Sequence, residues 1–436
     1  MNAPRAVVIG AGIGGLTAAA ALHRHGWSVT VLERSPALGA VGAGIGLAPN
    51  AVRALDTIGV GDDVRALSRW QNEGGLRRPD GRWVTRTTSD AFAERFGGPL
   101  VVVHRATLVD LLVSRLPAGA VRTAAPAALA DPGGPGRPAR VTVGAGLDAE
   151  NGEVRVRTQQ FAAVEEIEAD LVVGADGIHS AVRRTLFPQH PGPRYTGLTA
   201  WRVVVPAPDI PFAPHETWGR GAVWGTSPLH NGRIYAYGCA IAPAGGTSPD
   251  GERAELLRRF GTWHQPIPAV LAAAGAAGSG PVLRHDLYET AQALPAFHRG
   301  RVALLGDAVH AMAPMLGQGG CQAIEDGVVL AAHLGRPATA DSGDITPALA
   351  AYSAERLPRT MDVVRRSGRM CRAVALSSRP AVALRTAVIG VLGRFAPHVA
   401  LRSFDGIADW QPPSPTYAAG TGAAAEEAKP PRGTRP

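Results

Sequence analysis

The chain has 436 residues, which exceeds one average domain and allows a large buried core, so we expect at least two lobes. Its formal net charge is +8, but the arginines are scattered and form no basic tract, which argues against a nucleic-acid partner. Lys429 is the only lysine, which excludes a phosphate-binding P-loop and Schiff-base chemistry. Three widely spaced cysteines indicate neither a disulfide framework nor a zinc site, and they fit a reduced, cytoplasmic protein.

The hydropathy pattern bears on targeting and on membranes. An apolar strand pattern begins at Ala6 without a preceding basic and apolar leader, so we expect no signal peptide. No uninterrupted apolar run reaches the length of a membrane span. The apolar segment Pro380 to Phe404 contains arginines, and it fits a helix packed on the protein body better than a helix on a membrane surface.

Residues 6–33 have the pattern strand, glycine turn, helix, strand. Val7 to Ile9 are a short apolar run, Leu16 to His25 contain good helix formers, and Ser28 to Leu32 return to a strand pattern. The turn matches GxGxxG, which lets a pyrophosphate approach the amides at a helix N-terminus, and the acid after the second strand suits ribose hydroxyls. We therefore predict a dinucleotide site made by Gly10, Gly12, Ile13, Gly14, Gly15 and Glu33.

Two more apolar strands end beside a glycine and a carboxylate. The strand in DLVVGADGIHSAVRR precedes Asp176 and Gly177, and the strand in RVALLGDA precedes Gly306 and Asp307. Open α/β sheets bind ligands at the carboxyl ends of their strands. Both pairs are therefore candidates for the same dinucleotide site.

Residues 180–285 have a different character, because aromatic residues concentrate there. Asn231-Gly232 is a strong two-residue hairpin signal, so we expect an antiparallel sheet and a second lobe. Tyr235 and Tyr237 alternate with small residues and would share one sheet face. They fit a substrate cavity and a packed core equally well. The same two interpretations apply to the other candidate substrate contacts: Trp201, Arg202, Trp218, Trp224 and His230.

Taken together, the three motifs resemble those of the single-component FAD-dependent monooxygenases, the aromatic hydroxylase family that includes salicylate hydroxylase and zeaxanthin epoxidase. GxGxxG, DG and GD occur in the family's order and spacing between about Ala6 and Trp410. The resemblance implies an α/β fold class, with a Rossmann-like FAD-binding domain, an inserted antiparallel-sheet substrate domain and C-terminal helices. We expect the FAD-binding domain at 1–75, 98–180 and 285–370, the substrate domain at 76–97 and 181–284, a C-terminal helical segment at 371–410 and a disordered tail at 411–436.

The resemblance also implies cofactor contacts, residue by residue. The glycine turn, Glu33 and Arg34 would hold the ADP half of FAD, and Arg105 would approach the phosphates. Asp176 would belong to a motif linked to FAD and NAD(P)H, and Asp307 would hydrogen-bond the ribityl chain. A helix beginning near Gly319 would bring its positive end to the flavin ring. The other residues expected at the ring are Gly44, in a loop that continues to a helix opened by Asn50, and Pro314, Gly317, Gln318 and Gly320.

In this family NAD(P)H reduces a non-covalently bound FAD, oxygen adds to form a C4a-hydroperoxide, and one oxygen atom passes to the substrate. The resemblance thus implies an NAD(P)H:oxygen monooxygenase that hydroxylates or epoxidises an aromatic or polyunsaturated small molecule. Natural-product biosynthesis is one setting for such a reaction, and the enzyme would be a monomer or a homodimer. We assign no catalytic side chain and expect no metal.

Several reactive side chains near the GD motif have simpler interpretations. His310 has no second metal ligand at a suitable spacing, so we expect a hydrogen-bonded structural histidine. Cys321 has no evident partner base, so we expect a packed side chain rather than an activated thiol. Glu325 and Asp326 are adjacent, so we expect them to point to different parts of a helix surface and not to form a paired-carboxylate site.

Three other functions are compatible with parts of the pattern. A halogenase of the same fold is disfavoured, because WRVVVP at Trp201 lacks the second tryptophan of the WxWxIP motif and the only lysine lies in the tail. A flavin oxidase or reductase without oxygen transfer would keep the same cofactor motifs. A non-catalytic FAD-binding sensor would keep them too.

Overall fold

The computed structural model describes residues 3–39, 43–69, 73–144, 147–150, 153–156, 165–210, 212–335, 343–395 and 401–413. Side chains of residues 147–150 and 153–156 are not described. Residues 41 and 42 of the predicted flavin loop, and the predicted tail beyond Pro413, lie outside the described residues.

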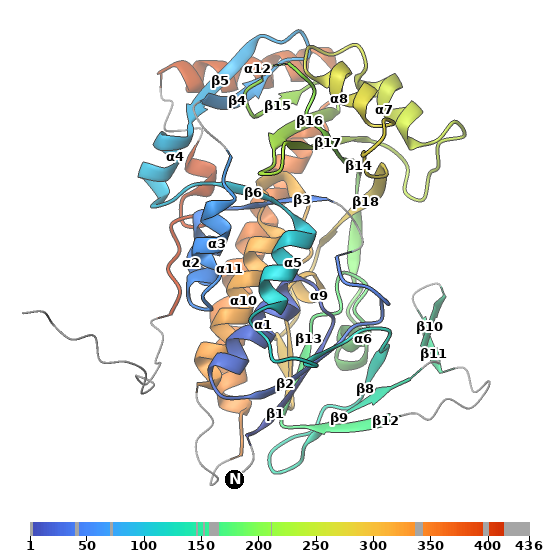
Figure 1. Ribbon diagram of the computed structural model, residues 1–436, viewed down its shortest axis with the longest axis vertical. Helices are drawn as coiled ribbons and strands as arrows, with labels where there is room; N and C mark the ends of the chain where they lie inside the picture. Colours follow the sequence, from blue (N-terminus) through green and yellow to red (C-terminus); the bar gives the residue numbers. More distant parts are fainter. Residues whose placement is uncertain are drawn as a thin grey trace, which may run out of the picture.

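A six-stranded, mostly parallel sheet organises the lower half of the molecule (Figure 1). Its central strands are mostly apolar and buried, as expected of a parallel sheet that is covered on both faces. Only the edge strand β19 runs antiparallel to its neighbour. In spatial order the strands are β19 (His298–Arg299), β20 (Val302–Leu304), β13 (Leu171–Gly174), β1 (Arg5–Ile9), β2 (Ser28–Leu32) and β7 (Val121–Arg122).

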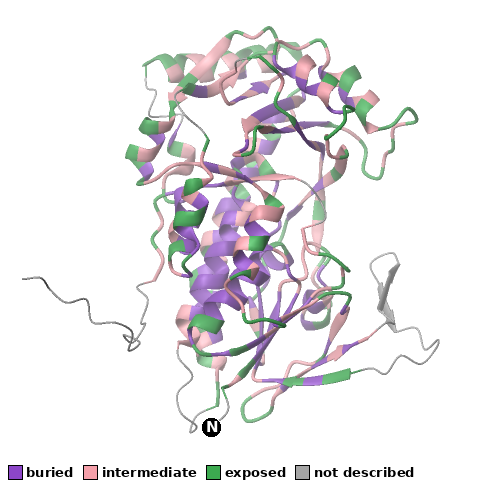
Figure 2. Cartoon of the chain, in the orientation of Figure 1, coloured by how far each residue is buried: buried purple, intermediate pink, exposed green. Residues whose placement is uncertain are grey.

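Three helices form the buried centre beside this sheet: α1 (Ile13–Arg24), α10 (Gly319–Leu334) and α11 (Thr346–Val374). Figure 2 shows α1 and α10 as mostly buried, and every residue from Cys321 to Ala331 is buried. A Cβ added to Gly327 of α10 would lie 2.7 Å from the backbone nitrogen of Ala18 in α1. The two helices therefore touch backbone to backbone, which fixes the position of α10 relative to the glycine turn.

A seven-stranded sheet forms the upper lobe. Its neighbouring strands are antiparallel except for β15 and β4, which are parallel. β16 and β17 form the predicted hairpin, although four residues, Leu229 to Gly232, separate the two strands instead of two. In spatial order the strands are β18 (Leu283–Thr290), β14 (Pro193–Pro206), β17 (Arg233–Ile241), β16 (Ala222–Pro228), β15 (His215–Trp218), β4 (Glu73–Arg77) and β5 (Trp83–Thr88).

The two faces of this sheet have different neighbours. The outer face packs against α7 (Glu252–Phe260) and α8 (Ile267–Ala273) in a closed hydrophobic core. The opposite face, here called the inner face, contacts α11 and the segment around Ala313 and Met315, which follows the GD motif. The side chains of the inner face that matter below are Arg202, Glu216, Trp218, Tyr235 and Tyr237.

Three predicted domain boundaries fall inside single elements. β4 and β18 lie wholly in the seven-stranded sheet, so boundaries at 75/76 and 284/285 cut these strands. The boundary at 370/371 cuts α11, which continues to Val374. These boundaries were wrong because hydrophobic periodicity identifies a strand or helix without showing which sheet or layer it joins.

The apolar C-terminal segment forms α12 (Arg379–Phe395), which packs on β5. A Cβ added to Gly393 would lie 2.7 Å from the side chain of Thr85, so the helix sits close to the strand. Its opposite side exposes apolar residues, including Leu384 and Phe395. In the part of the chain that the structure describes, no helix has the length and apolar composition needed to cross a bilayer.

The remaining elements connect or cover the two sheets. The two-stranded sheet β3 (Gly44–Leu47) and β6 (Val101–His104) lies beside the inner face, where Ala43 and Val102 pack in one cluster with Tyr235. The remaining strands are β8 (Ala127–Asp131), β9 (Ala139–Val143), β10 (Leu147–Glu150), β11 (Glu153–Val156) and β12 (Glu165–Ala169). The remaining helices are α2 (Pro49–Asp56), α3 (Gly61–Ala66), α4 (Ser89–Phe96), α5 (Arg105–Val113), α6 (Ala181–Leu186), α9 (Asp307–His310), η1 (Pro314–Leu316) and η2 (Arg402–Phe404).

Candidate active site

The three sequence motifs lie at one edge of the parallel sheet, here called the cofactor edge. β1, β2, β13 and β20 are parallel neighbours, so their carboxyl ends lie side by side. The glycine turn follows β1, Glu33 follows β2, and Asp176 and Asp307 follow β13 and β20. This is the edge at which open α/β sheets bind ligands.

The glycine turn is closely packed at Gly10 and open at Gly12. Gly10 has φ of +107°, and a Cβ added to it would lie 2.4 Å from the carbonyl oxygen of Ala175. Gly12 is the N-cap of α1, and an added Cβ there would meet no atom within 4 Å. The first turn of α1 contains no acidic residue, and its leading amides have no acceptor within the helix. The turn thus fits a phosphate group.

Glu33 ties the glycine turn to the end of β2. Its Oε2 accepts a hydrogen bond from the amide of Ala11 at 2.8 Å, and its Oε1 accepts one from the amide of Ser35 at 2.9 Å. A carboxylate has about four lone-pair sites, so two remain for ribose hydroxyls. The neighbouring Arg34 is exposed.

The carboxylate of Asp176 accepts hydrogen bonds from neighbouring residues of the protein. Its Oδ2 accepts hydrogen bonds from the amides of Ala181 at 2.7 Å and Val182 at 3.1 Å, at the start of α6. Its Oδ1 accepts a hydrogen bond from the hydroxyl of Ser180, which is itself the N-cap residue of α6. Asp176 therefore organises the DG loop by capping a helix.

Arg183 joins the DG loop to the GD loop. Its guanidinium donates to the carbonyl oxygen of Ala308 at 2.7 Å and to that of Ile178 at 3.0 Å. Burial lowers the pKa of Arg183 from its ordinary value. The sequence shows that Arg183 belongs to the DG motif, but no local pattern predicts its contact with the GD loop.

Asp307 contrasts with Asp176, because its carboxylate is exposed and has no partner among the described residues. A Cβ added to Gly319 would lie 4.0 Å from Asp307 Oδ1, so this carboxylate stands next to the start of α10. Arg105, the first residue of α5, is likewise exposed. An available carboxylate suits the ribityl hydroxyls of FAD, and an available guanidinium suits its phosphates.

Below the start of α10 lies a buried charge cluster, formed by Glu325, Asp326, Arg356 and His310. Arg356 Nη1 donates to Glu325 Oε2 at 2.5 Å, and its Nε donates to Asp326 Oδ1 at 2.7 Å. Asp326 Oδ2 lies 2.6 Å from His310 Nε2 and accepts a hydrogen bond from the amide of Gly306 at 2.9 Å. The two adjacent acids have otherwise different partners, as expected of neighbouring helix residues, but one arginine of α11 binds both, and both are buried. His310 is hydrogen-bonded and fully buried, as expected for a structural residue.

Opposite charges keep both acids of this cluster ionised. Burial alone would raise the pKa of Asp326, but the charges of His310 and Arg356 hold it at about 2. For Glu325, likewise, the opposing charges of Arg356 and Arg359 outweigh burial and lower the pKa. The cluster is therefore a charge-balanced structural unit that fixes Gly306 and α10 together.

The network continues to the residues predicted beside the flavin. Asn50 Nδ2 donates to Glu325 Oε1 at 2.6 Å and to Gln318 Oε1 at 3.1 Å. The side chain of Gln318 is thus buried in the network, whereas Gly317 beside it is exposed with φ of +62°. Burial raises the pKa of the Cys321 thiol to about 12, which agrees with a packed residue and excludes an activated thiol.

The inner face closes over β3 and the segment after the GD motif. A Cβ added to Gly44 would lie 2.3 Å from the ring of Tyr235, so this glycine makes room for the tyrosine. Arg202 lies close enough to Tyr235 for its charge to oppose the rise in pKa that burial of the phenol causes. Trp218 packs in one cluster with Met315, while Pro314 is exposed.

Glu216 is an inner-face residue that sequence reasoning missed. Trp218 Nε1 donates to its Oε2 at 2.8 Å, and the hydroxyl of Tyr237 donates to its Oε1. Burial raises the pKa of Glu216. The available signal was the alternation in His215 to Trp218, which puts Glu216 and Trp218 on one face, but no motif marks this acid.

Two candidate substrate contacts, Trp201 and Trp224, lie on the outer face, away from the cofactor edge. Trp201 and Trp224 are 2% and 0% exposed and belong to the outer-face core with Phe260. Trp201 Nε1 donates to Glu252 Oε2 at 2.6 Å, and Trp224 Nε1 donates to Thr226 Oγ1 at 2.8 Å. Of the two interpretations left open for these tryptophans, the packed core therefore holds for both, since alternation along a strand shows which residues share a face but not which face meets the cofactor edge.

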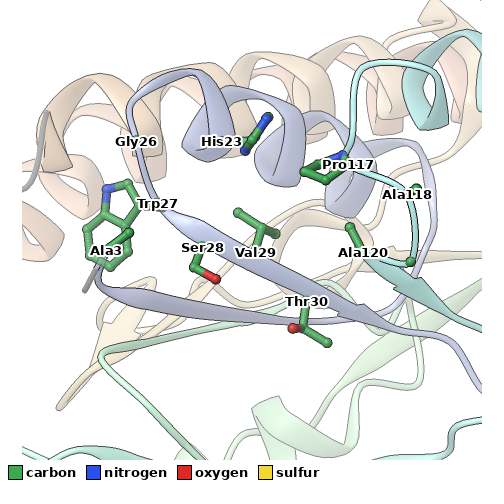
Figure 3. Close-up of a pocket in the computed structure, with 11 residues that line it drawn as sticks. Ala3, His23, Gly26, Trp27, Ser28, Val29, Thr30, Pro117, Ala118 and Ala120 are labelled. Atoms are coloured by element: carbon green, nitrogen blue, oxygen red, sulfur yellow. The ribbon is translucent and has the colours of Figure 1, made fainter.

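A hollow of about 480 Å³ lies elsewhere on the parallel sheet (Figure 3). His23, Trp27, Ser28 and Pro117 line it, at the end of α1 and the start of β2. These positions are at the amino ends of the strands, opposite the cofactor edge, so this hollow is not the candidate site. Among the described residues there is no cluster of three or more side chains suited to hold a metal ion.

Comparisons with known proteins agree with this geometry. Residues 139–367 match the FAD binding domain family, and residues 8–50 match the NAD(P)-binding Rossmann-like domain family. The chain is 35% identical over 366 residues to aurachin C monooxygenase/isomerase of Stigmatella aurantiaca, covering 84% of this chain and 88% of that protein. It is 35% identical over 384 residues to 3-amino-4-hydroxybenzoate 2-monooxygenase of Streptomyces cremeus, covering 86% and 89%.

The fold is also similar to a solved structure, Klebsiella pneumoniae HpxO complexed with FAD and uric acid. The TM-score is 0.76 at 28% identity, over 93% of this chain and 96% of that chain. The family match, the two relatives and the shared architecture all point to the same class that the motifs predicted. The chain therefore belongs to the FAD-dependent monooxygenases, which use FAD as cofactor and NAD(P)H as co-substrate and incorporate one oxygen atom into their substrates.

Proposed function

We propose that this monooxygenase oxygenates a small aromatic substrate held between the inner face of the seven-stranded sheet and the cofactor edge. The observation that carries this proposal is the position of Arg202, Glu216, Trp218 and Tyr237. All four are only half-buried, although they lie on the face that packs toward the segment after the GD motif. Solvent therefore reaches a polar and aromatic surface beside the predicted flavin position.

Bound FAD would supply the redox and oxygen chemistry. The amides at the start of α1 would hold its pyrophosphate, Glu33 its adenosine ribose, Arg105 its phosphates and Asp307 its ribityl chain. We infer that Asp176 acts indirectly, because its carboxylate caps α6. The start of α10 would place its positive end at the ring, beside the exposed Gly317 and Pro314.

The relatives support an aromatic substrate. Their names specify aurachin C and 3-amino-4-hydroxybenzoate, and the similar solved structure contains uric acid. Hydroxylation and epoxidation both suit the same geometry. We infer a cytoplasmic monomer or homodimer, and the buried free thiols of Cys239, Cys321 and Cys371 support a reducing compartment.

Turnover of the purified, FAD-loaded protein tests the proposal. We expect an aromatic substrate to accelerate NADH or NADPH oxidation and oxygen uptake, and we expect a product heavier by one oxygen atom by mass spectrometry. Heavy-isotope oxygen gas should label that atom. Consumption of NAD(P)H with hydrogen peroxide as the only oxygen product, across a panel of hydroxylated and nitrogen-containing aromatics, would support an oxidase instead.

Asp307→Ala tests the assignment of the cofactor edge. We expect FAD affinity to fall about 10- to 100-fold, which corresponds to loss of a hydrogen bond to a charged group. Titration of the apoprotein with FAD, followed by flavin fluorescence, measures this change. Asp250→Ala is the matched control, because Asp250 is exposed in the connection between β17 and α7. Equal FAD affinity in the Asp307 variant and the control would remove the role given to Asp307.

A further inference from the structure

The inner face contains a carboxylate that the cofactor contacts do not use. Glu216 pairs with Gly225 across β15 and β16, and Gly225 pairs with Tyr237 across β16 and β17. A Cβ added to Gly225 would lie 2.2 Å from the Tyr237 ring, so this glycine allows the tyrosine to lie across β16. The Tyr237 hydroxyl thereby reaches Glu216 from two strands away.

Glu216 keeps hydrogen-bonding capacity after these contacts. Each of its oxygens accepts one hydrogen bond, from Tyr237 or from Trp218, whereas a carboxylate can accept about four. No described cation forms an ion pair with it. The side chain is half-buried rather than sealed, so solvent still reaches part of it. A carboxylate in such surroundings is stabilised by a further hydrogen-bond donor.

The outer face of the same sheet contains a similar hydrogen bond between a tryptophan and a glutamate, which serves as a structural comparison. Glu252 of α7 also accepts a hydrogen bond from a tryptophan, Trp201. There Arg259 lies over the indole ring with its Cζ 5.1 Å from the ring centroid, and the indole is 2% exposed. Arg385 lies over the Trp218 ring in the same way, with its Cζ 5.3 Å from the ring centroid, and Glu216 and Glu252 are both half-buried. The two contacts therefore differ in the tryptophan, which is sealed in the outer-face core at Trp201 and half-buried on the inner face at Trp218.

We propose that Glu216, held by Tyr237 and Trp218, is a substrate subsite that accepts a hydrogen bond from an O–H or N–H group on the aromatic ring. This inference rests on the proposed function and narrows its substrate class to hydroxylated aromatics and aromatics with a ring N–H. Tyr237 and Trp218 fix the carboxylate, and the donor of the substrate completes its hydrogen bonding. Such a contact fixes which ring carbon faces the flavin.

The contact also favours the reaction electronically. A hydrogen bond to a carboxylate oxygen polarises the O–H or N–H bond and leaves more electron density on the ring. An electron-rich ring is what oxygen transfer in this family requires. Arg202 of β14 pairs with Tyr237 of β17, so a second, anionic substituent of the substrate has a cation on the same face.

Paired ligands that differ only in the donor test this subsite. The probes are 2-naphthol against 2-methoxynaphthalene and 3-hydroxybenzoate against 3-methoxybenzoate, titrated into the FAD-loaded protein while the flavin absorbance is followed. We expect wild type to bind at least one hydroxyl compound about 10- to 100-fold more tightly than its methyl ether. Glu216→Gln should bring that ratio close to one, and Tyr237→Phe should lower it in part.

Glu252→Gln is the matched control, because it removes the equivalent carboxylate from the outer face and should keep the wild-type ratio. FAD content and melting temperature confirm that each variant is folded. A wild type that does not distinguish any hydroxyl compound from its ether, or a Glu216→Gln variant with the wild-type ratio, overturns the proposal. The titration measures binding and needs no turnover. A protein that consumes NAD(P)H without oxygenating substrate would therefore refute the proposed function, and the ratio of binding affinities would still test the subsite.

Discussion

The molecule contains two buried carboxylate centres that differ in how their charge is balanced. In the cluster below α10, Glu325 and Asp326 share Arg356 and are fully buried. On the inner face, Glu216 has only neutral donors, Tyr237 and Trp218, and is half-buried. Opposing charges lower the pKa of both acids in the cluster, whereas burial raises the pKa of Glu216.

This difference separates a structural centre from a binding centre. A carboxylate that is matched by a cation and sealed from solvent has nothing left to offer a ligand, but it holds elements together. A carboxylate with neutral partners and remaining lone pairs costs folding free energy and gains from a bound donor. The following predictions test whether the two centres have these separate roles.

Removing the cation of the structural centre should have the largest effect. Arg356→Met would leave two buried carboxylates without their partner, and we expect a loss of about 3 to 5 kcal/mol in the free energy of unfolding. Urea unfolding followed by far-UV circular dichroism measures it. Arg365→Met is the control, because Arg365 is exposed and its ion pair with Asp362 at 3.3 Å should contribute at most about 1 kcal/mol. A similar small loss for both variants would show that the buried cluster contributes little.

Acid should weaken the same centre. The pKa of Asp326 is about 2 in the folded protein, below its ordinary value of 3.8, so the folded state binds fewer protons than the unfolded state. The stabilisation from Asp326 is therefore fully present above about pH 4 and is lost as the pH falls toward 2, an effect of roughly 2 kcal/mol. We expect the unfolding free energy of wild type to fall more steeply between pH 4 and 2 than that of Asp326→Asn, with a difference in slope of up to about one bound proton. Equal slopes would contradict this assignment.

The smallest effect on stability should come from the binding centre. Glu216→Gln keeps the shape of the side chain and removes a charge that has no cation, so we expect a change within about 1 kcal/mol, toward higher stability. The same urea experiment measures it at neutral pH. A loss comparable to that of Arg356→Met would mean that Glu216 is a structural residue, which would also weaken the substrate subsite proposed for it.

Sequence patterns predicted the arrangement of the cofactor edge because each of its motifs is a short, continuous segment. Each motif contains a strand, a turn and the start of a helix within a few residues, and parallel neighbours then bring Gly10, Asp176 and Asp307 to one edge. The capping role of Asp176 was not predicted, although Ser180 and the amides that it binds lie within six residues. The family resemblance predicted a cofactor role for Asp176 and said nothing about the start of α6.

Contacts between distant segments could not be predicted in the same way. Arg356 lies 30 residues after Asp326 in a different helix, and nothing in either segment indicates that they meet. Glu216 meets Tyr237 only because β15, β16 and β17 are consecutive neighbours in the sheet. Alternation put Tyr235 and Tyr237 on one face, as observed, but it could not tell that Trp201 and Trp224 face the helices α7 and α8.

The alternation of side chains in β15 limits which insertions and deletions this strand can tolerate. His215 and Thr217 face outward, and Glu216 and Trp218 face inward. Inserting or deleting one residue within this four-residue strand would exchange the two sets and move the carboxylate into the hydrophobic core under α7 and α8. Substitutions at inner-face positions leave the strand ladder intact. New substrate preferences are therefore reached more readily through point substitutions here than through insertions or deletions, which belong in the loops.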